Sequence, residues 1–365
     1  HIEALRRLPG IEVVAILNRG ADKVKAKAEE LGIDHYYDDY QQLLESESLD
    51  CIHICTPNNL HYQMAKEALH RGIHVMCEQP LATSIAEATD LVSLAASKKL
   101  VNAVHFNIRY YPMVRQMRTM REKGELGEVY SIIGSYLQDW LFYQTDYNWR
   151  LEPAQSGESR ALADIGSHLL DLLEYISGRR IVQVFADINV VHKVRKKPLK
   201  PIETYSGKML DPKDYQDVPI NTEDYASVLL RFDNGNKGVI TVSQVAAGRK
   251  NRLSLEIAGA AKSWNWSSER PNELWVGERD SLNGELLRDP SLFHPEASSL
   301  VSYPGGHNEG FPDTSKQMFK EVYAAVSTGK QPDRPTFPTF EDGLRELRLN
   351  EAIMTSAKTE KWVVV

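Results

Sequence analysis

Short apolar runs and amphipathic segments alternate through the first hundred residues of the chain. The apolar runs are three to seven residues long, and each is followed by apolar residues at helical spacing. Strands that alternate with helices at this interval indicate crossover units, and therefore a parallel sheet covered on both faces. We expect strands at Ile11–Leu17, His35–Tyr37, Asp50–Cys55, Ile73–Cys77 and Leu100–His105, with helices at Ala21–Leu31, Gln41–Leu44, Leu60–His70 and from Ser84 onward.

Two of these helices have recognisable starts. Asn58 or Asn59 stands where a side chain can cap the helix that contains Leu60–His70. Ser84 and Glu87 have the spacing of a capping box, in which each side chain binds the other residue's backbone amide. Both starts directly follow predicted strands, which supports the alternation.

Beyond residue 125 the pattern becomes mostly strands. We expect an antiparallel sheet in a second, α+β domain, because Asp233–Asn236 has the turn chemistry of a hairpin between two strands. The domains are predicted at 1–107 (parallel sheet), 108–338 (α+β) and 339–365 (final helix and strand). The expected strands are Glu128–Leu137, Ile181–Val191, Asp224–Phe232, Lys237–Val245, Arg252–Ile257 and Trp362–Val365, and the expected helices are Ser159–Ile176, Phe311–Ser327 and Thr339–Ala357.

Composition narrows the classes of partner. The chain of 365 residues is 42% hydrophobic and 25% charged, with a formal net charge of −7, which argues against nucleic acid as a partner. The basic run 193–197 contains no aromatic residues, so we interpret it as a solvated loop. No run of 18 apolar residues occurs, so we expect no membrane partner.

The cysteines indicate a reducing compartment. An odd total of three does not make a disulfide framework, so we expect a cytoplasmic protein. Cys51, His53 and Cys55 alternate onto one face of a strand, a spacing that metal ligands can use. The run around them reads as a strand buried on both faces, and no fourth ligand is evident. We therefore predict no metal site.

Polar residues and prolines follow three successive strands. Thr56, Pro57 and Asn58 end one strand, and Glu78, Gln79 and Pro80 end the next; Asn107 and Arg109 follow the third. Ligands of an open parallel sheet bind at the carboxyl ends of its strands, so these residues are candidates for a binding site. The alternative is that they are ordinary strand–helix turns, whose chemistry also favours Pro and Asn.

The predicted helix Ser159–Ile176 carries a polar stripe with catalytic chemistry. Asp164, His168 and Asp171 fall at i, i+4 and i+7. A carboxylate one helical turn from an imidazole raises the basicity of the imidazole and orients its ring. A histidine that removes a hydroxyl proton needs both properties. Gly166 weakens the helix and suggests a close approach there. The alternative is a solvated helix pair. The opposite stripe is apolar: Ile165, Leu169, Leu172, Leu173 and Ile176.

Taken together, these motifs resemble the Gfo/Idh/MocA oxidoreductases in order and spacing. The resemblance spans essentially the whole chain. It implies a Rossmann cofactor domain, a second domain like the C-terminal half of glyceraldehyde-3-phosphate dehydrogenase, an NAD(P) cofactor and a sugar, sugar derivative or cyclic polyol as substrate. It also implies a homo-oligomer through the open face of the second sheet, with dimer and tetramer both open. The motifs are Thr56-Pro57-Asn58, Cys77-Glu78-Gln79-Pro80, Asn107-Ile108-Arg109, Asp164-Ile165-Gly166-Ser167-His168 and Thr339-Phe340-Glu341-Asp342-Gly343.

The resemblance assigns roles residue by residue. His168 would be the general base, and Asp164 would bind substrate and orient His168. Trp149 and Arg150 look like part of a sugar-facing loop, and His307 is a candidate from the other rim; ordinary loop packing is the alternative for both regions. Residues implied to contact cofactor are Thr56, Pro57, Asn58, Glu78 at the ribose, Gln79, Pro80, and Asn107 and Arg109 at the nicotinamide.

Gln79 departs from the family pattern, which has Lys at this position. Glutamine donates and accepts hydrogen bonds but cannot titrate, so Gln79 would hold the substrate hydroxyl while His168 carries the proton alone. Weakened activity is expected from this change. A non-catalytic sensor of sugar or cofactor is the alternative function that Gln79 favours.

The start of the chain is the second departure. A dinucleotide fold opens with a strand and a Gly-rich phosphate turn, whereas here a helix is already under way at His1. We expect that first strand and turn to be missing from this sequence and cofactor binding to suffer. Asn18 and Arg19 end the second strand where an acidic residue would select NAD, so NADP is favoured. Stacking of Arg19 on adenine would leave NAD acceptable.

Overall fold

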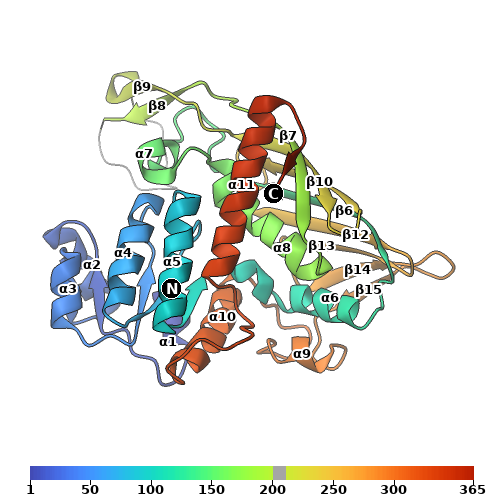
Figure 1. Ribbon diagram of the computed structural model, residues 1–365, viewed down its shortest axis with the longest axis horizontal. Coiled ribbons are helices and arrows are strands. Elements are labelled where there is room, and N and C mark those ends of the chain that lie inside the picture. Colours follow the sequence, from blue (N-terminus) through green and yellow to red (C-terminus); the bar gives the residue numbers. More distant parts are fainter. Residues whose placement is uncertain (200–210) are drawn as a thin grey trace.

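The computed structural model describes residues 1–199 and 211–365. The first part of the chain forms a domain of parallel strands and helices. The later part forms a large twisted sheet with helices on one face (Figure 1). The predicted pairing of an α/β domain with an α+β domain is therefore confirmed.

The N-terminal domain follows the predicted alternation. Its strands fall in two parallel sheets, β1-β2 and β3-β4-β5, and no hydrogen-bonded pair of described strands joins β1 to β3. The first strand is shorter than predicted and begins at Ala15. The elements are α1 (Ile2–Arg6), β1 (Ala15–Leu17), α2 (Ala21–Leu31), β2 (His35–Tyr37), α3 (Tyr40–Ser46), β3 (Cys51–Ile54), α4 (Asn58–His70), β4 (His74–Cys77), α5 (Ile85–Lys98) and β5 (Asn102–Val104).

One of the two predicted helix starts is confirmed. The Ser84 hydroxyl accepts from the backbone amide of Glu87, and the Glu87 carboxylate binds the amide of Thr83 rather than that of Ser84. The asparagine cap of α4 was predicted wrongly, because Pro57 is the residue before the first turn. Asn58 Nδ2 instead donates to the carbonyl oxygen of Ser156 at 2.9 Å, so a tertiary contact takes the side chain that could have capped.

The C-terminal domain has one nine-stranded sheet with the order β15-β14-β13-β12-β6-β11-β10-β7-β16. Most neighbours are antiparallel, as predicted, but β6 and β11 are parallel, so the sheet is mixed. The predicted hairpin is present as β10-β11. The strands are β6 (Val129–Leu137), β7 (Ile181–Asn189), β10 (Tyr225–Phe232), β11 (Lys237–Ser243), β12 (Arg252–Gly259), β13 (Ser263–Ser267), β14 (Glu273–Gly277), β15 (Gly284–Leu287) and β16 (Val363–Val364).

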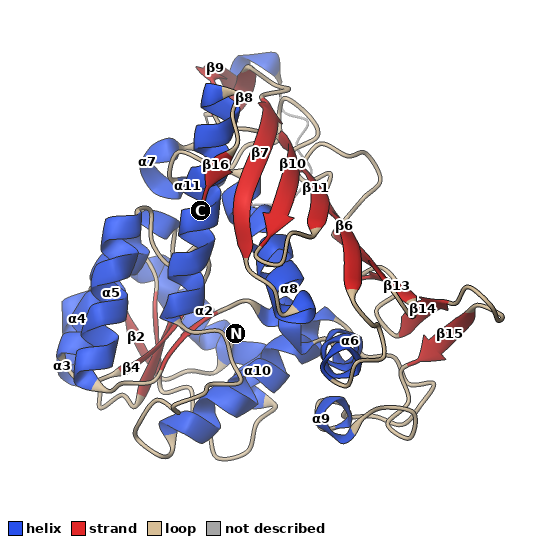
Figure 2. Ribbon diagram, turned by 45° about the vertical axis from the view of Figure 1, so that its right-hand side comes forward, coloured by secondary structure: helices blue, strands red, loops and turns tan. Residues whose placement is uncertain are grey.

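Helices cover one face of this sheet (Figure 2). A Cβ added at Gly134 would lie 3.0 Å from a Leu169 methyl, so glycine lets helix α8 pack closely on β6. Helix α11 packs on β7 and also on α5 and β5, which joins the two domains. The remaining elements are η1 (Asn107–Tyr110), α6 (Pro112–Glu122), η2 (Trp149–Leu151), α7 (Pro153–Ser156), η3 (Leu162–Gly166), α8 (Ser167–Ser177), η4 (Pro212–Asp214), α9 (Pro295–Ser298), α10 (Phe311–Val326) and α11 (Phe340–Thr359).

The basic run is not the solvated loop that we predicted. It forms strand β8 (Val194–Pro198), which pairs with β9 (Tyr215–Pro219). Arg195 is fully buried, and its guanidinium donates to Asp224 Oδ1 at 2.7 Å. Asp224 lies far away in sequence, so a local pattern could not reveal this pairing. No helix in the described residues is long and apolar enough to cross a membrane.

Candidate active site

The segment predicted as one helix is divided in the structure. A π-helical turn, η3, precedes helix α8, and π turns inside helices occur frequently at functional sites. Asp164 lies in the π turn and His168 lies in the first turn of α8. The apolar stripe is buried as predicted: Ile165, Leu169, Leu172, Leu173 and Ile176.

The carboxylate of Asp164 is held on both oxygens. Arg150 Nε donates to Oδ1 at 3.1 Å, and Gln244 Nε2 donates to Oδ2 at 2.8 Å. The Gln244 amide is itself oriented by buried Arg160, whose Nη1 donates to Oε1 at 2.9 Å. Asp164 is therefore fixed in place by a chain of side chains that starts in the interior.

His168 lies beside this carboxylate but does not bind it. Among the described residues Nδ1 is buried without a hydrogen-bond partner, whereas Nε2 is not among the buried unpaired atoms. The predicted orientation of the ring by Asp164 is thus not seen as a hydrogen bond, and the hydrogen-bond partners of the Asp164 carboxylate are Arg150 and Gln244. Burial lowers the pKa of His168 to about 4, so the ring is neutral near pH 7. A neutral imidazole is the form that accepts a proton.

Gln79 connects the end of β4 to this turn. Its Nε2 donates to the backbone carbonyl oxygen of Asp164 at 2.9 Å, and its Oε1 accepts from the Ser167 hydroxyl at 2.9 Å. The Arg150 guanidinium lies over the Trp149 ring, 4.5 Å from its centroid. The structure thus brings together five predicted residues: Gln79, Trp149, Arg150, Asp164 and His168.

The ends of the parallel strands carry groups suited to a dinucleotide. Asn18 and Arg19 are exposed at the end of β1, directly before helix α2, whose N-terminus has no side-chain cap from the part of the chain that the structure describes. Uncapped backbone amides at a helix N-terminus bind anions. Thr56 and Pro80 lie close together, because His61 contacts both of their carbonyl oxygens, at 2.9 and 2.8 Å. These polar groups lie at the carboxyl ends of the parallel strands, where an open sheet of this kind binds its ligands.

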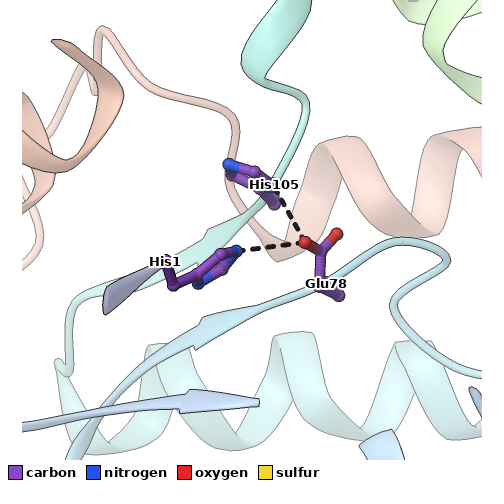
Figure 3. Close-up of side chains that lie close together, drawn as sticks. All are labelled: His1, Glu78 and His105. Carbon is purple, nitrogen blue, oxygen red and sulfur yellow. Dashed lines mark hydrogen bonds and ion pairs between the residues drawn. The ribbon is translucent and has the colours of Figure 1, made fainter. Parts of the chain in front are cut away.

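Glu78 lies in a cluster with two histidines. Its Oε1 is 3.0 Å from His1 Nε2 and 3.0 Å from His105 Nδ1 (Figure 3). Burial opposes a charge on Glu78, but His105 and His1 hold its pKa well below the usual range. Burial likewise opposes a charge on His1, yet Cys55 and Glu78 raise its pKa to about 10. Sequence reasoning missed this cluster, since its members are far apart in the chain.

Three predicted site residues have their contacts elsewhere. Arg109 is paired with Asp171 and with Asp342, the latter at 2.7 Å. Asn107 Nδ2 donates to the Thr314 hydroxyl at 2.7 Å. His307 is exposed. The Asp171 carboxylate was predicted to share a stripe with Asp164, and it serves instead as an ion-pair partner between elements.

Two residues of the site were not predicted. Gln244 follows strand β11 and Ser167 opens helix α8, and both hold groups of the site by hydrogen bonds. Ser167 lies inside the motif from Asp164 to His168, so the sequence could have identified it as a site residue. No sequence pattern could have identified Gln244, because its role arises from a contact between residues 80 positions apart.

Comparisons with known proteins identify the family profiles and the relatives that this chain matches. The profile described as "Oxidoreductase family, NAD-binding Rossmann fold" matches residues 1–106, and that described as "GFO/IDH/MocA C-terminal domain" matches residues 114–264. Levoglucosan dehydrogenase of Pseudarthrobacter phenanthrenivorans is 27% identical over 369 residues, which cover 98% of this chain and 90% of that protein.

Solved structures are similar over nearly the whole chain. An oxidoreductase domain protein from Kribbella flavida has 30% identity and a TM-score of 0.88, and the match covers 100% of this chain and 95% of that one. Levoglucosan dehydrogenase in complex with NADH and L-sorbose has 27% identity and a TM-score of 0.85, with coverage of 96% and 89%. The fold and the order of its elements are therefore those of known oxidoreductases.

Proposed function

The chain belongs to the Gfo/Idh/MocA family of oxidoreductases with an NAD-binding Rossmann fold, and we propose that it oxidises or reduces one carbon of a sugar, sugar derivative or cyclic polyol. The observation that carries the proposal is neutral His168 beside the fixed carboxylate of Asp164. Relatives described as levoglucosan dehydrogenase support a sugar-type substrate.

In the oxidative direction His168 accepts the proton of the substrate hydroxyl at Nε2. The tautomer with hydrogen on Nδ1 leaves the Nε2 lone pair available, and Nδ1 is the nitrogen that is buried. In the reductive direction the same atom first takes up a proton from water and then gives it to the substrate oxygen. A bound nicotinamide supplies the hydride acceptor or donor.

Asp164, Arg150 and Trp149 support a sugar-facing role. The Asp164 carboxylate accepts hydrogen bonds from sugar hydroxyls, and the guanidinium of Arg150 donates to them. The Trp149 ring offers an apolar face for the C–H groups of a pyranose or cyclitol. Gln244 and Arg160 keep the carboxylate in one orientation, which reduces the entropy lost when substrate binds.

NAD(P) is the proposed cofactor. Thr56, Pro57 and Asn58 would line it at the end of β3, and Gln79 and Pro80 would line it at the end of β4. Arg19 would pair with a 2′-phosphate, so NADP remains the form that the sequence favours. The solved relative with a sugar contains NADH, and the choice between the two cofactors is therefore a question for titration.

A sensor without turnover is the second candidate. Each functional group of Gln79 already has one partner, on Asp164 and on Ser167, which leaves one N–H and one lone pair for a substrate hydroxyl, and neither group carries a charge. This observation supports the expectation of weakened activity. Absorbance at 340 nm with both cofactors and a panel of sugars and cyclitols separates the candidates, because binding without turnover would contradict the enzymatic function.

The uncovered face of the large sheet is the proposed subunit interface. Ile133 on β6 is 53% exposed and Leu229 on β10 is 46% exposed, although each is a large apolar side chain within a strand. Their neighbours in sequence point the opposite way into the core. A homodimer or tetramer would bury these groups, and a monomer mass by light scattering would contradict this proposal.

A further inference from the structure

Three side chains from separate elements converge on one point in the N-terminal domain (Figure 3). His1 precedes α1, Glu78 follows β4 and His105 follows β5. One nitrogen or oxygen atom from each lies within 4.8 Å of the other two. The imidazoles are 10% and 7% exposed, and the carboxylate is 31% exposed. The group is thus mostly enclosed, with access on the side of Glu78.

The outer contacts of the cluster orient both rings. His105 Nε2 is 3.0 Å from the Ser315 hydroxyl. His1 Nδ1 is 2.8 Å from His53 Nδ1, and His53 Nε2 is 3.1 Å from the Tyr323 hydroxyl. One arrangement of hydrogens satisfies all three contacts: each outer nitrogen of His105 and His1 donates, and His53 donates to Tyr323.

This arrangement leaves acceptors facing one another at the centre. With both rings neutral, His1 Nε2 and His105 Nδ1 each present a lone pair, and both are 3.0 Å from the same oxygen of Glu78. Acceptors at this separation repel unless a cation lies between them, which is either a proton on His1, as its raised pKa favours, or a metal ion. Histidines that ligate metals usually donate a hydrogen bond from their other ring nitrogen to a protein group. That bond fixes the tautomer and the orientation of the ring.

We propose that His1, Glu78 and His105 bind one divalent cation of the zinc class. Two imidazoles and one carboxylate are ligands that zinc accepts, and water would take the fourth position. Ligand atoms around tetrahedral zinc lie about 3.3 Å apart, so a small opening of the two 3.0 Å contacts admits the ion. The ion would tie the start of α1 to the ends of β4 and β5.

This site is distinct from the one considered on sequence alone. Cys51, His53 and Cys55 do not converge as ligands among the described residues, and His53 contributes to the proposed site only as the partner of His1. The inference does not rest on the proposed function, since none of the hydrogen bonds given above involves Asp164 or His168, although the charges of Glu78 and His105 also act on the His168 ring.

A proton is the competing occupant, and metal titration distinguishes the two. Purified full-length protein, first stripped with a chelator, is titrated with Zn²⁺ against a chromophoric chelator and separately with Co²⁺. The expected result is one equivalent of Zn²⁺ per chain and the visible absorption of tetrahedral Co²⁺. Zinc should also restore a melting temperature that the chelator lowers.

Variants assign the binding to this cluster. His105→Gln and Glu78→Gln should weaken Zn²⁺ binding by at least about a hundredfold, and Ser315→Ala, which keeps all three ligands, should weaken it by about tenfold. His35→Gln is the matched control, because His35 also contacts a glutamate, Glu47, at 2.6 Å but at an exposed site. Substoichiometric zinc in the unmodified protein, or equal affinity in Ser315→Ala and the ligand variants, would overturn the proposal.

Discussion

The side-chain amide of Gln79 donates a hydrogen bond to the backbone carbonyl oxygen of Asp164 at 2.9 Å. This contact joins the end of strand β4 to the π-helical turn that carries the Asp164 carboxylate. It also means that the residue in place of the family's lysine supports the geometry of the site. One of its two amide hydrogens is directed at the backbone, and its oxygen accepts from the Ser167 hydroxyl.

Replacement Gln79→Lys is expected to raise kcat for a sugar substrate by about tenfold to a hundredfold. An ammonium group provides the charged donor that a developing alkoxide requires, which an amide lacks. The single hydroxyl hydrogen of Ser167 has the Ala163 carbonyl oxygen as its other acceptor, at 2.9 Å, so the fold should tolerate the change. Steady-state kinetics measure the effect, and an unchanged kcat would contradict it.

Replacement Gln244→Leu is expected to raise KM for the sugar roughly tenfold, because it removes one of the two hydrogen bonds that hold the Asp164 carboxylate. Cofactor affinity should stay the same. Gln183→Leu is the matched control, since Gln183 also binds an arginine, Arg231, but on the large sheet away from this site. Equal KM values in the two variants would refute the positioning role of Gln244.

The pH dependence of oxidation should reflect the low pKa of His168. The base must be neutral to accept a proton, and burial lowers its pKa from the ordinary 6.5 to about 4. We therefore expect kcat/KM to stay level from about pH 8 to about pH 6, and its acidic limb to lie well below the usual histidine range. An acidic limb of kcat/KM centred near pH 6.5 in the unmodified protein, and absent in His168→Asn, would show that burial does not lower the pKa of His168.

Cofactor choice should respond to Arg19. This residue is exposed beside the N-terminus of α2, where a positive charge can meet a 2′-phosphate. Arg19→Glu should lower the ratio of NADP to NAD specificity by about tenfold or more, since it also introduces repulsion. The ratio of kcat/KM values measures this, and an unchanged ratio would assign Arg19 to a different contact.

Local patterns predicted much of the fold because local physics decides those elements. The Ser84 cap and the hairpin at Asp233–Asn236 depend on residues within a few positions of one another, and both are present. The predictions failed where distant residues decide. Arg195 is buried because Asp224 neutralises its charge. The Asn58 side chain binds the Ser156 carbonyl oxygen instead of capping α4.

The same distinction applies to the site. The motif from Asp164 to His168 pointed to this turn, and helical spacing predicted that Asp164 orients His168. The π turn and the donors Arg150 and Gln244 give Asp164 different partners, and two of these three features come from elsewhere in the chain. The sequence did not predict the cluster of His1, Glu78 and His105, because these residues are far apart in the chain.

The most direct test of the enzymatic account is reduction of NAD(P) at 340 nm by full-length protein, compared with His168→Asn, across a panel of sugars and cyclitols. We predict turnover by the unmodified protein on at least one member, and a loss of at least about a hundredfold in kcat/KM for the variant with cofactor binding retained. Equal turnover in both proteins, or none in either despite bound cofactor and sugar, would contradict the assignment of His168 as the base.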